Sequence, residues 1–568
     1  MVARTEARVD DGFASLESAA RPAPTGAHWA AVSAVVAVGL GLRLYLLYHL
    51  PLDSDEAVVG LMAGQIRHGH FFTFYWGQAY GGVEPYLVAA WTAVAGSGPV
   101  ALNAVPTVLC ALGAVLAWRI ARRLVPAETR ALAAAAGLVL WIWPEVVIYN
   151  SVQELGFRGV TLVSGLGVLL LALRVSETGS VLDCCALGLC AGIGWWSSPE
   201  IVYFAVPAAL LLVARRARLR AAGLRRLALV LLAAGIGAAP WLVTNLRTGF
   251  LSLRVSSSPV YTTATYAERL SMFFTRALPM ALGLRLSPTA SWLWGRVGEA
   301  LYVVAVGALS ALCVVALAGA RSPGGHRALG SLAAGILVFP VVFALFPATG
   351  SWDPGRYVVF LTPLVVLLAT GVLGEALPPA RRRRDGPAGA PAALKAALSA
   401  GRLAALVVAA ASVVSLASFD TAWLSGRPGR FVSGWGDAVA TAARTVSSME
   451  ADNIRGGYAS YWIAYDLDEL SGGHLIVSDP TYARWPAENV RAGHLARPAW
   501  IFPGPAQKDV ASAFPSDAES GDLVAEPRFL AALQELGIRW RRVRVGVLVA
   551  VVPNRAVTPA AIAATLAS

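Results

Sequence analysis

Long apolar runs recur along most of this 568-residue chain, and they exclude most soluble folds. A helix needs about 20 apolar residues to cross a hydrocarbon core of about 30 Å. Charged residues make up only 14% of the chain, against about 25% in soluble domains. The sequence therefore predicts a mainly α-helical, polytopic membrane bundle of about 11 spans, near residues 28–50, 100–121, 130–149, 157–174, 180–197, 199–214, 227–246, 295–319, 328–347, 355–377 and 401–423.

Arginine clusters predict the orientation of this bundle in a cytoplasmic membrane. If residues 1–27 form a disordered cytoplasmic tail, the segments between spans that fall inside hold nearly every arginine cluster, as the positive-inside rule requires. The linker 378–400 is then a flexible cytoplasmic loop, and the loops 51–99 and 247–294 lie on the outer face. The run at 84–96 is too short to cross, so we expect an interfacial helix there. The net charge of +12 thus reflects topology, not nucleic-acid binding.

Composition changes after residue 424, where polar residues return. Short alternating runs (GYASYW, HLIVS, AWIFP) are interleaved with helical patterns near 434–451, 461–471 and 526–536. This mixture predicts a small exocytoplasmic α/β domain over residues 425–568. The last apolar run has Gly546 near its middle and is either a tight hairpin or one long bent strand.

An acidic cluster directly after the first span is the first candidate site. It holds Asp53, Asp55 and Glu56, and ionisable groups at the membrane edge usually mark function. Asp55 could take a proton from an acceptor hydroxyl, with Glu56 beside it. Asp53 and Asp55 could instead hold a divalent cation, Mg²⁺ or Mn²⁺, through oxygen ligands. A purely structural alternative is that Asp55 caps the helix starting at Glu56, although capping needs only one acid.

Aromatic and polar residues follow this cluster. Candidates for sugar contact, or for an interfacial aromatic belt, are Tyr75, Trp76, Gln78 and Tyr80, with Glu84 as a further acid on the same side. Two more outer segments carry Glu154 with Arg158 and, in WWSSPE, Glu200. Glu154 and Glu200 lie at predicted helix starts, where acids are favoured in any case.

Arginines on the outer face are candidates for anion binding. Arg356 and Tyr357 open a late span in SWDPGRY, where an arginine is poorly placed for the helix dipole but well placed to bind a phosphate. The alternatives are an arginine at the membrane interface or an ion pair with Asp353. Arg276 and Arg285 of the loop 247–294 are further phosphate-binding candidates. Separately, Gly188-xxx-Gly192 fits a close helix–helix contact.

Several of these motifs together resemble the GT-C superfamily of integral-membrane glycosyltransferases, which includes protein O-mannosyltransferases and lipid A aminoarabinose transferases. The matching pieces are the pair Asp55-Glu56, FYWGQAYGGVEPY, PWLVTN at 240–245, LPMALGLR at 278–285 and the pair Arg356-Tyr357. The segment GGYASYWIAYDLDELSGGHLIVS resembles the exocytoplasmic part of an uncharacterised bacterial branch.

The resemblance implies transfer of a sugar from a polyprenyl-phosphate donor to an acceptor hydroxyl at the outer face. Asp55 would be the general base or orient the acceptor, and Arg356 would hold the donor phosphate. The sequence GGVEPY stands where the mannosyl and aminoarabinosyl branches usually carry a basic residue before Pro-Pro, so the sugar and the glycan, lipid or protein acceptor stay open. The competing hypotheses are a flippase or transporter of lipid-linked saccharides, for which we find no paired repeats, and a non-catalytic scaffold.

Overall fold

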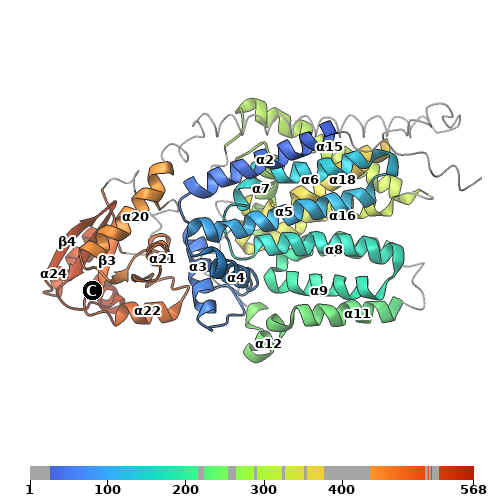
Figure 1. The fold of residues 1–568 in the computed structure, drawn as a ribbon. Coiled ribbons are helices and arrows are strands. Elements are labelled where there is room, and N and C mark those ends of the chain that lie inside the picture. Colours follow the sequence, from blue (N-terminus) through green and yellow to red (C-terminus); the bar gives the residue numbers. More distant parts are fainter. Residues whose placement is uncertain are drawn as a thin grey trace, which may run out of the picture.

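The structure, a computed structural model, describes residues 26–214, 223–253, 264–286, 291–322, 326–350, 355–376, 435–505, 510, 513–514 and 524–567. A helical bundle and a C-terminal α/β domain lie end to end, as Figure 1 shows. The predicted tail up to residue 25, the linker 378–400 and the predicted span 401–423 lie outside the described residues.

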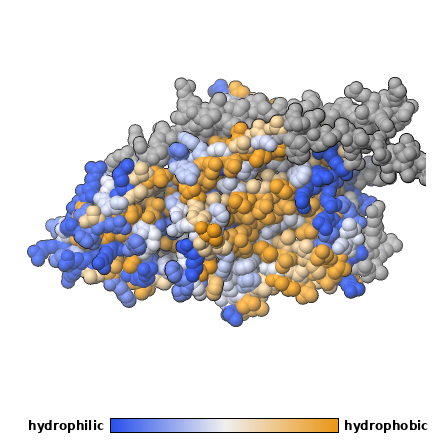
Figure 2. Space-filling model, in the orientation of Figure 1, coloured by the Kyte–Doolittle hydropathy of each residue, from blue (hydrophilic) through white to orange (hydrophobic). Residues whose placement is uncertain are grey.

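Within those ranges, five helices are long and apolar enough to cross a membrane, and they indicate a multi-pass membrane protein. They are α2 (Gly26–His49), α5 (Pro99–Leu124), α8 (Arg158–Thr178), α15 (Arg296–Arg321) and α16 (Arg327–Leu345). Helices α11 (Gly223–Gly237) and α12 (Ala239–Thr248) are bent by 71° and would count as a sixth span if taken together. Figure 2 shows apolar surface over the bundle and polar surface over the C-terminal domain.

The other predicted spans are shorter or interrupted, so length and composition support fewer than the eleven predicted. Those in the described ranges are α6 (Arg130–Ile142) with α7 (Glu145–Asn150), α9 (Val181–Ser197), α10 (Val202–Ala214), and α17 (Gly355–Val358) with α18 (Leu361–Ala376). Between α6 and α7 the chain is extended at Trp143 and Pro144, because a residue before proline is disfavoured in the α region. Hydropathy alone does not register such breaks.

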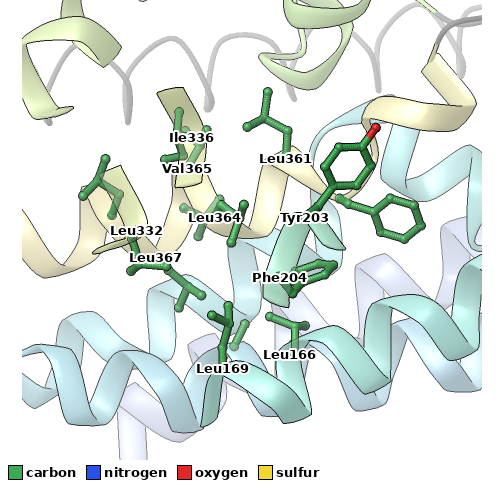
Figure 3. Packing of buried hydrophobic residues seen from close by; sticks show 14 of the residues in the cluster. Leu166, Leu169, Tyr203, Phe204, Leu332, Ile336, Leu361, Leu364, Val365 and Leu367 are labelled. Carbon is green, nitrogen blue, oxygen red and sulfur yellow. The ribbon is translucent and has the colours of Figure 1, made fainter. Parts of the chain in front are cut away.

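Aliphatic and aromatic side chains from four helices fill the centre of the bundle. Figure 3 shows them meeting: Leu166 and Leu169 of α8, Tyr203 and Phe204 of α10, Leu332 and Ile336 of α16, and Leu361, Leu364, Val365 and Leu367 of α18. Elsewhere α9 and α11 pack closely through the predicted glycine pair. A Cβ atom at Gly188 or Gly192 would lie 2.1 Å from the carbonyl oxygen of Val230 or Ala234, so the predicted close contact is confirmed.

Two short helices, α3 (Ser54–Arg67) and α4 (Glu84–Ala95), lie between the bundle and the C-terminal domain (Figure 1). Helix α4 has 12 residues and is too short to cross a bilayer, as predicted for 84–96. The apolar face of α3 joins the core of the C-terminal domain: Val58 and Met62 belong to the same buried cluster as Ile463 and Leu467. The two parts therefore share one hydrophobic core at this boundary.

The C-terminal domain contains a five-stranded mixed sheet of order β2-β1-β3-β5-β4. Strand β1 (Gly456–Tyr458) is parallel to β2 (Ile476–Ser478) and β3 (Ala499–Pro503), whereas β5 (Leu548–Pro553) is antiparallel to β3 and β4 (Trp540–Val545). Gly546, at φ 58°, makes the turn of a hairpin, which decides between the two predicted forms of the last run. The helices are α20 (Trp435–Ala451), α21 (Tyr461–Leu470), α22 (Pro486–Gly493), α24 (Glu526–Glu535) and α25 (Pro559–Ala567).

Candidate functional site

The first turn of α3 assigns different roles to the three clustered acids. Asp53 is the N-cap: its carboxylate accepts a hydrogen bond of 2.8 Å from the Asp55 N–H. Glu56 completes a capping box by accepting one of 3.4 Å from the Asp53 N–H. The alternative that Asp55 caps this helix is therefore wrong, because the helix begins at Ser54, two residues before Glu56. The Asp55 side chain is left to make long-range contacts.

Asp55 binds two arginines and one tyrosine from distant parts of the chain. Its carboxylate lies 3.2 Å from Nη1 of Arg356 and 3.4 Å from Nη2 of Arg484. The hydroxyl of Tyr461 donates a third contact of 2.6 Å. Burial by itself would raise the pKa of Asp55, but Arg356, then Arg484 and the Tyr461 hydroxyl, outweigh it and hold the pKa below its ordinary value. Asp55 is therefore ionised at neutral pH.

Asp53, the candidate metal ligand, is buried behind Asp55. Burial, with the negative charge of Asp55, raises the pKa of Asp53 to about 6. Among the residues that the structure describes, no group of three His, Cys, Asp or Glu side chains is arranged to hold a metal ion. The carboxylate of Asp53 is used by the helix cap, and its role as a ligand stays a prediction.

Arg158, the first residue of α8, fixes the backbone beside Arg356. Its Nε donates a hydrogen bond of 2.8 Å to the Arg356 carbonyl. Its guanidinium lies 4.6 Å from the ring centre of Phe157 and 5.4 Å from that of Tyr357. Arg158 thus holds α17 against the end of α8, so that the Arg356 side chain meets Asp55.

Glu56 of α3 and two other predicted acids, Glu154 and Glu84, form a buried network. The Asn103 amide donates to Glu56 (2.9 Å) and accepts from the Glu154 N–H (2.8 Å), so it connects these two acids. The Glu154 carboxyl donates to the carboxyl of Glu84. Burial, with Glu84 nearby, raises the pKa of Glu154 well above its usual value, and burial raises that of Glu84 to about 7. Such a shared proton lets two carboxyl groups stay together out of water.

This network predicts a pH-dependent stability. The pKa of Glu84 is raised in the folded state. Its contribution to the free energy of unfolding is therefore fully present below 4.5, its pKa in the unfolded chain, and is lost as pH rises toward about 7. We expect the wild-type protein to lose about 3 kcal/mol of stability between pH 5 and pH 8 from this group. Glu84→Gln should flatten that profile in thermal unfolding, whereas the exposed Glu535→Gln should not. An equally steep profile in Glu84→Gln would contradict the network.

A cavity of about 300 Å³ opens beside Tyr357, the neighbour of Arg356. Its walls are mainly apolar and rich in aromatic side chains, and its polar residues include Glu200 and Ser198. Burial raises the pKa of Glu200 to about 7, although Arg158 and Ser198 act in the opposite direction. The lining residues include Tyr80, Phe157, Trp195, Trp241, Phe346 and Tyr357. Three residues singled out from the sequence, Tyr80, Glu200 and Tyr357, therefore line a space that one compact polar ring could occupy.

The remaining predicted residues are placed around this centre or away from it. The Tyr75 hydroxyl donates 2.8 Å to the Asp55 carbonyl, and the Gln78 N–H donates to the Tyr75 carbonyl in a turn. The Trp76 ring stacks on Trp485 of the C-terminal domain, with ring centres 4.5 Å apart. These three residues therefore contact the backbone of Asp55, each other or the C-terminal domain.

The two phosphate-binding candidates of the loop 247–294 are placed elsewhere. Arg285 lies over the Trp292 ring, 4.9 Å from its centre, and donates to the Thr275 carbonyl. Arg276 lies in the π-helical turn Phe273–Ala277. The arginines that the structure places in ion pairs with Asp55 are Arg356 and Arg484, so phosphate binding by Arg276 or Arg285 stays a prediction.

Three residues of the site were missed by reasoning from sequence: Asn103, Tyr461 and Arg484. Asn103 lies inside an apolar span, where a lone amide gave no sign of its partners. Tyr461 and Arg484 each follow a short parallel strand, β1 or β2, of the C-terminal domain. Loops at the carboxyl ends of parallel strands commonly carry functional residues, and that rule would have singled them out had the strands been predicted as parallel.

The whole fold is similar to that of a solved membrane protein. The crystal structure of ArnT from Cupriavidus metallidurans bound to undecaprenyl phosphate aligns with 93% of this chain and 98% of its own, with TM-score 0.55 and 16% sequence identity. The apo form aligns with 94% and 99%, with TM-score 0.56 and 16% identity. The fold is GT-C-like. No family model and no curated protein matches the sequence significantly.

Proposed function

We propose that this protein is a GT-C-type glycosyltransferase that moves a sugar from a polyprenyl-phosphate donor to an acceptor hydroxyl at the outer face of the cytoplasmic membrane. The observation that carries the proposal is the ion pair of 3.2 Å between Asp55 and Arg356, 301 residues apart in sequence. A base and a phosphate-binding cation are the two groups that such a reaction requires side by side.

The chemistry assigns one role to each partner. The acceptor oxygen forms a bond to the anomeric carbon, the bond from that carbon to the phosphate oxygen breaks, and the acceptor proton goes to Asp55. The leaving phosphate carries the negative charge, which Arg356 stabilises as it develops. When Arg356 binds the phosphate, Asp55 loses part of its positive surroundings and becomes a stronger base. Donor binding thus activates the base.

The cavity beside Tyr357 supports a sugar as the transferred group. Aromatic walls with few polar groups are typical of small-molecule sites, because the walls supply contact area and the polar groups fix orientation. Sugar rings stack on Tyr80 and Trp241, and Glu200 and Ser198 hydrogen-bond to sugar hydroxyls. Tyr357 borders the cavity and directly follows Arg356, so we place the sugar of the donor in this space and its phosphate at Arg356.

The undecaprenyl phosphate in the structure of ArnT supports a lipid-phosphate donor. Exposed apolar side chains cover the bundle helices, for example Val303, Val304 and Val314 of α15. A donor tail in the bilayer would place its phosphate at the end of the bundle, where Arg356 lies.

The proposal is tested in proteoliposomes loaded with undecaprenyl-phosphate-linked hexoses and pentoses, with a cell-envelope extract as the source of acceptor. We expect the wild-type protein to release undecaprenyl phosphate from one donor and to label the extract. Movement of intact donor across the bilayer without release of the carrier would instead show a flippase and contradict the proposal.

A further inference from the structure

Two loops of the C-terminal domain reach into the candidate site from the carboxyl edge of its sheet. Tyr461 starts α21 three residues after β1 ends, and Arg484 comes just before α22 in the loop that follows β2. The two strands are parallel neighbours, so the loops leave the same edge of the sheet. That edge faces α3, against which α21 packs (Figure 1). Tyr461 and Arg484 thereby meet Asp55 from one side, opposite Arg356.

Arg484 is locked in this position. Its side chain is 6% exposed, and Nη1 donates 3.3 Å to the Trp76 carbonyl while Nη2 reaches Asp55. Three aromatic rings surround the guanidinium at 4.8–5.4 Å from their centres, those of Tyr75, Tyr461 and Tyr482. Its stem passes so near Gly77 that a Cβ there would lie 2.6 Å from Cδ. A guanidinium this enclosed has little access to solvent and cannot swing out to a ligand.

Tyr461 supplies the shortest contact to Asp55. Its hydroxyl lies 2.6 Å from Oδ1, the oxygen that Arg484 also approaches, while Arg356 approaches Oδ2. Burial raises the pKa of Tyr461 well above 10, so its hydroxyl keeps the proton that it donates. One turn further along α21, Asp466 accepts 3.0 Å from the Ser54 hydroxyl and ties the helix to the start of α3. The two oxygens of Asp55 are thus held by different parts of the chain.

We infer that Tyr461 and Arg484 are positioning residues of the same active site, and that the C-terminal domain completes the site by holding the Asp55 carboxylate and supplying its second cation. The inference rests on the proposed function. It assigns a division of labour: Arg356 turns to the donor phosphate during the reaction, and Arg484 stays with Asp55 throughout. The domain is then part of the catalytic centre and not an accessory for acceptor choice.

A pH profile distinguishes positioning from mere support. The charged and titratable groups around Asp55 are Asp53 and Glu56 at the start of α3, Tyr75 of the following loop, Arg158 of α8, Arg356 and Tyr357 of α17, and Tyr461, Asp466 and Arg484 of the C-terminal domain. Of these, Tyr461 and Arg484 favour the ionised carboxylate by direct contact. If either side chain is removed, Asp55 protonates more readily. As the pH is lowered, sugar transfer should then be lost at a higher pH than in the wild-type protein.

The central test compares Tyr461→Phe with Tyr458→Phe. Both tyrosines are buried in the same domain, but the Tyr458 ring packs on Trp500, away from Asp55. In Tyr461→Phe we expect the acidic limb of the pH profile of kcat/KM to move upward by about one pH unit, so that the loss of kcat/KM is larger at pH 4 than at pH 8. In Tyr458→Phe the acidic limb of the pH profile should lie at the same pH as in the wild-type protein. A folded Tyr461→Phe protein with the wild-type pH profile would overturn the inference.

Arg484 provides the second comparison. Arg484→Lys keeps the charge, so the acidic limb of the pH profile should stay where it is in the wild-type protein, although turnover falls. Arg484→Met should move that limb to higher pH by more than Tyr461→Phe does. Arg491→Met, on the neighbouring α22, removes a half-exposed arginine paired with Glu488 and should leave the profile unchanged. Equal profiles for Arg484→Met and the wild-type protein would also overturn the inference.

A readout independent of turnover separates this inference from the proposed function. The drop in thermal midpoint caused by Tyr461→Phe should largely disappear when Asp55 is already Asn, since the hydroxyl then has no carboxylate to hold. An undiminished drop would refute the contact even if transfer were confirmed. Conversely, an Asp55→Asn protein with full turnover would refute the proposed function, whatever the cycle shows.

Discussion

Sugar transfer is expected to fall by about 100- to 10,000-fold when Asp55 is replaced by Asn, the range that loss of a general base produces. Asn keeps the shape of the side chain but cannot accept the proton of the acceptor hydroxyl. The measurement is release of undecaprenyl phosphate from the donor that the wild-type protein uses. Donor binding should persist, because Arg356 is still present to bind the phosphate.

Two controls separate chemistry from folding in this experiment. Asp452→Asn removes a carboxylate that pairs with Arg541 on the surface of the C-terminal domain and should retain wild-type turnover. Thermal unfolding of Asp55→Asn should show a folded protein, although two arginines that face a neutral amide will lower its midpoint. Wild-type turnover in folded Asp55→Asn would remove this residue from the mechanism.

Arg356→Gln is expected to weaken use of the donor about 10- to 100-fold, the equivalent of one or two charge-assisted hydrogen bonds to the phosphate. The donor KM should rise much more than the acceptor KM, because the acceptor does not touch this guanidinium. Initial rates over a matrix of donor and acceptor concentrations give both constants. Arg541→Gln is the control, since this arginine pairs with Asp452 far from the site.

The reverse result would change the interpretation of Arg356. If both KM values rose by the same factor, the side chain would hold α17 in place and would not bind the donor. The same would follow if Arg356→Lys, which keeps the charge but loses the bidentate geometry, were no better than Arg356→Gln.

The sequence was most informative about Asp55 and Arg356. Each appeared as a charged residue at the end of an apolar run, where it is costly unless it has a use, and the structure brings the two within 3.2 Å. Glu154 and Glu84 were also singled out, but as independent acids. Their shared proton became visible only in three dimensions, because it depends on how α4 and the loop before α8 pack around Asn103.

The predictions from sequence that were wrong concern features for which more than one position along the chain satisfies the same local preference. Either Asp53 or Asp55 satisfies the preference for an acid at a helix N-cap, and a shift of two residues in the helix start decides which carboxylate is left for the site. Similarly, a hydropathy run does not reveal an extended pair such as Trp143-Pro144 or the bend of 71° between α11 and α12. Backbone geometry, and not average apolarity, divides those runs.

The amino-acid sequence by itself indicated a helical membrane bundle with a small α/β domain toward the C-terminus, and showed that acids and arginines gather at the ends of the apolar runs. Periodicity and composition are local properties, so one pass along the chain reveals them. Only the tertiary structure decided that Arg484 and Tyr461, more than 400 residues from Asp55, share its carboxylate. Those contacts exist because α21 packs on α3 in one shared core, and no local pattern encodes which two surfaces will meet.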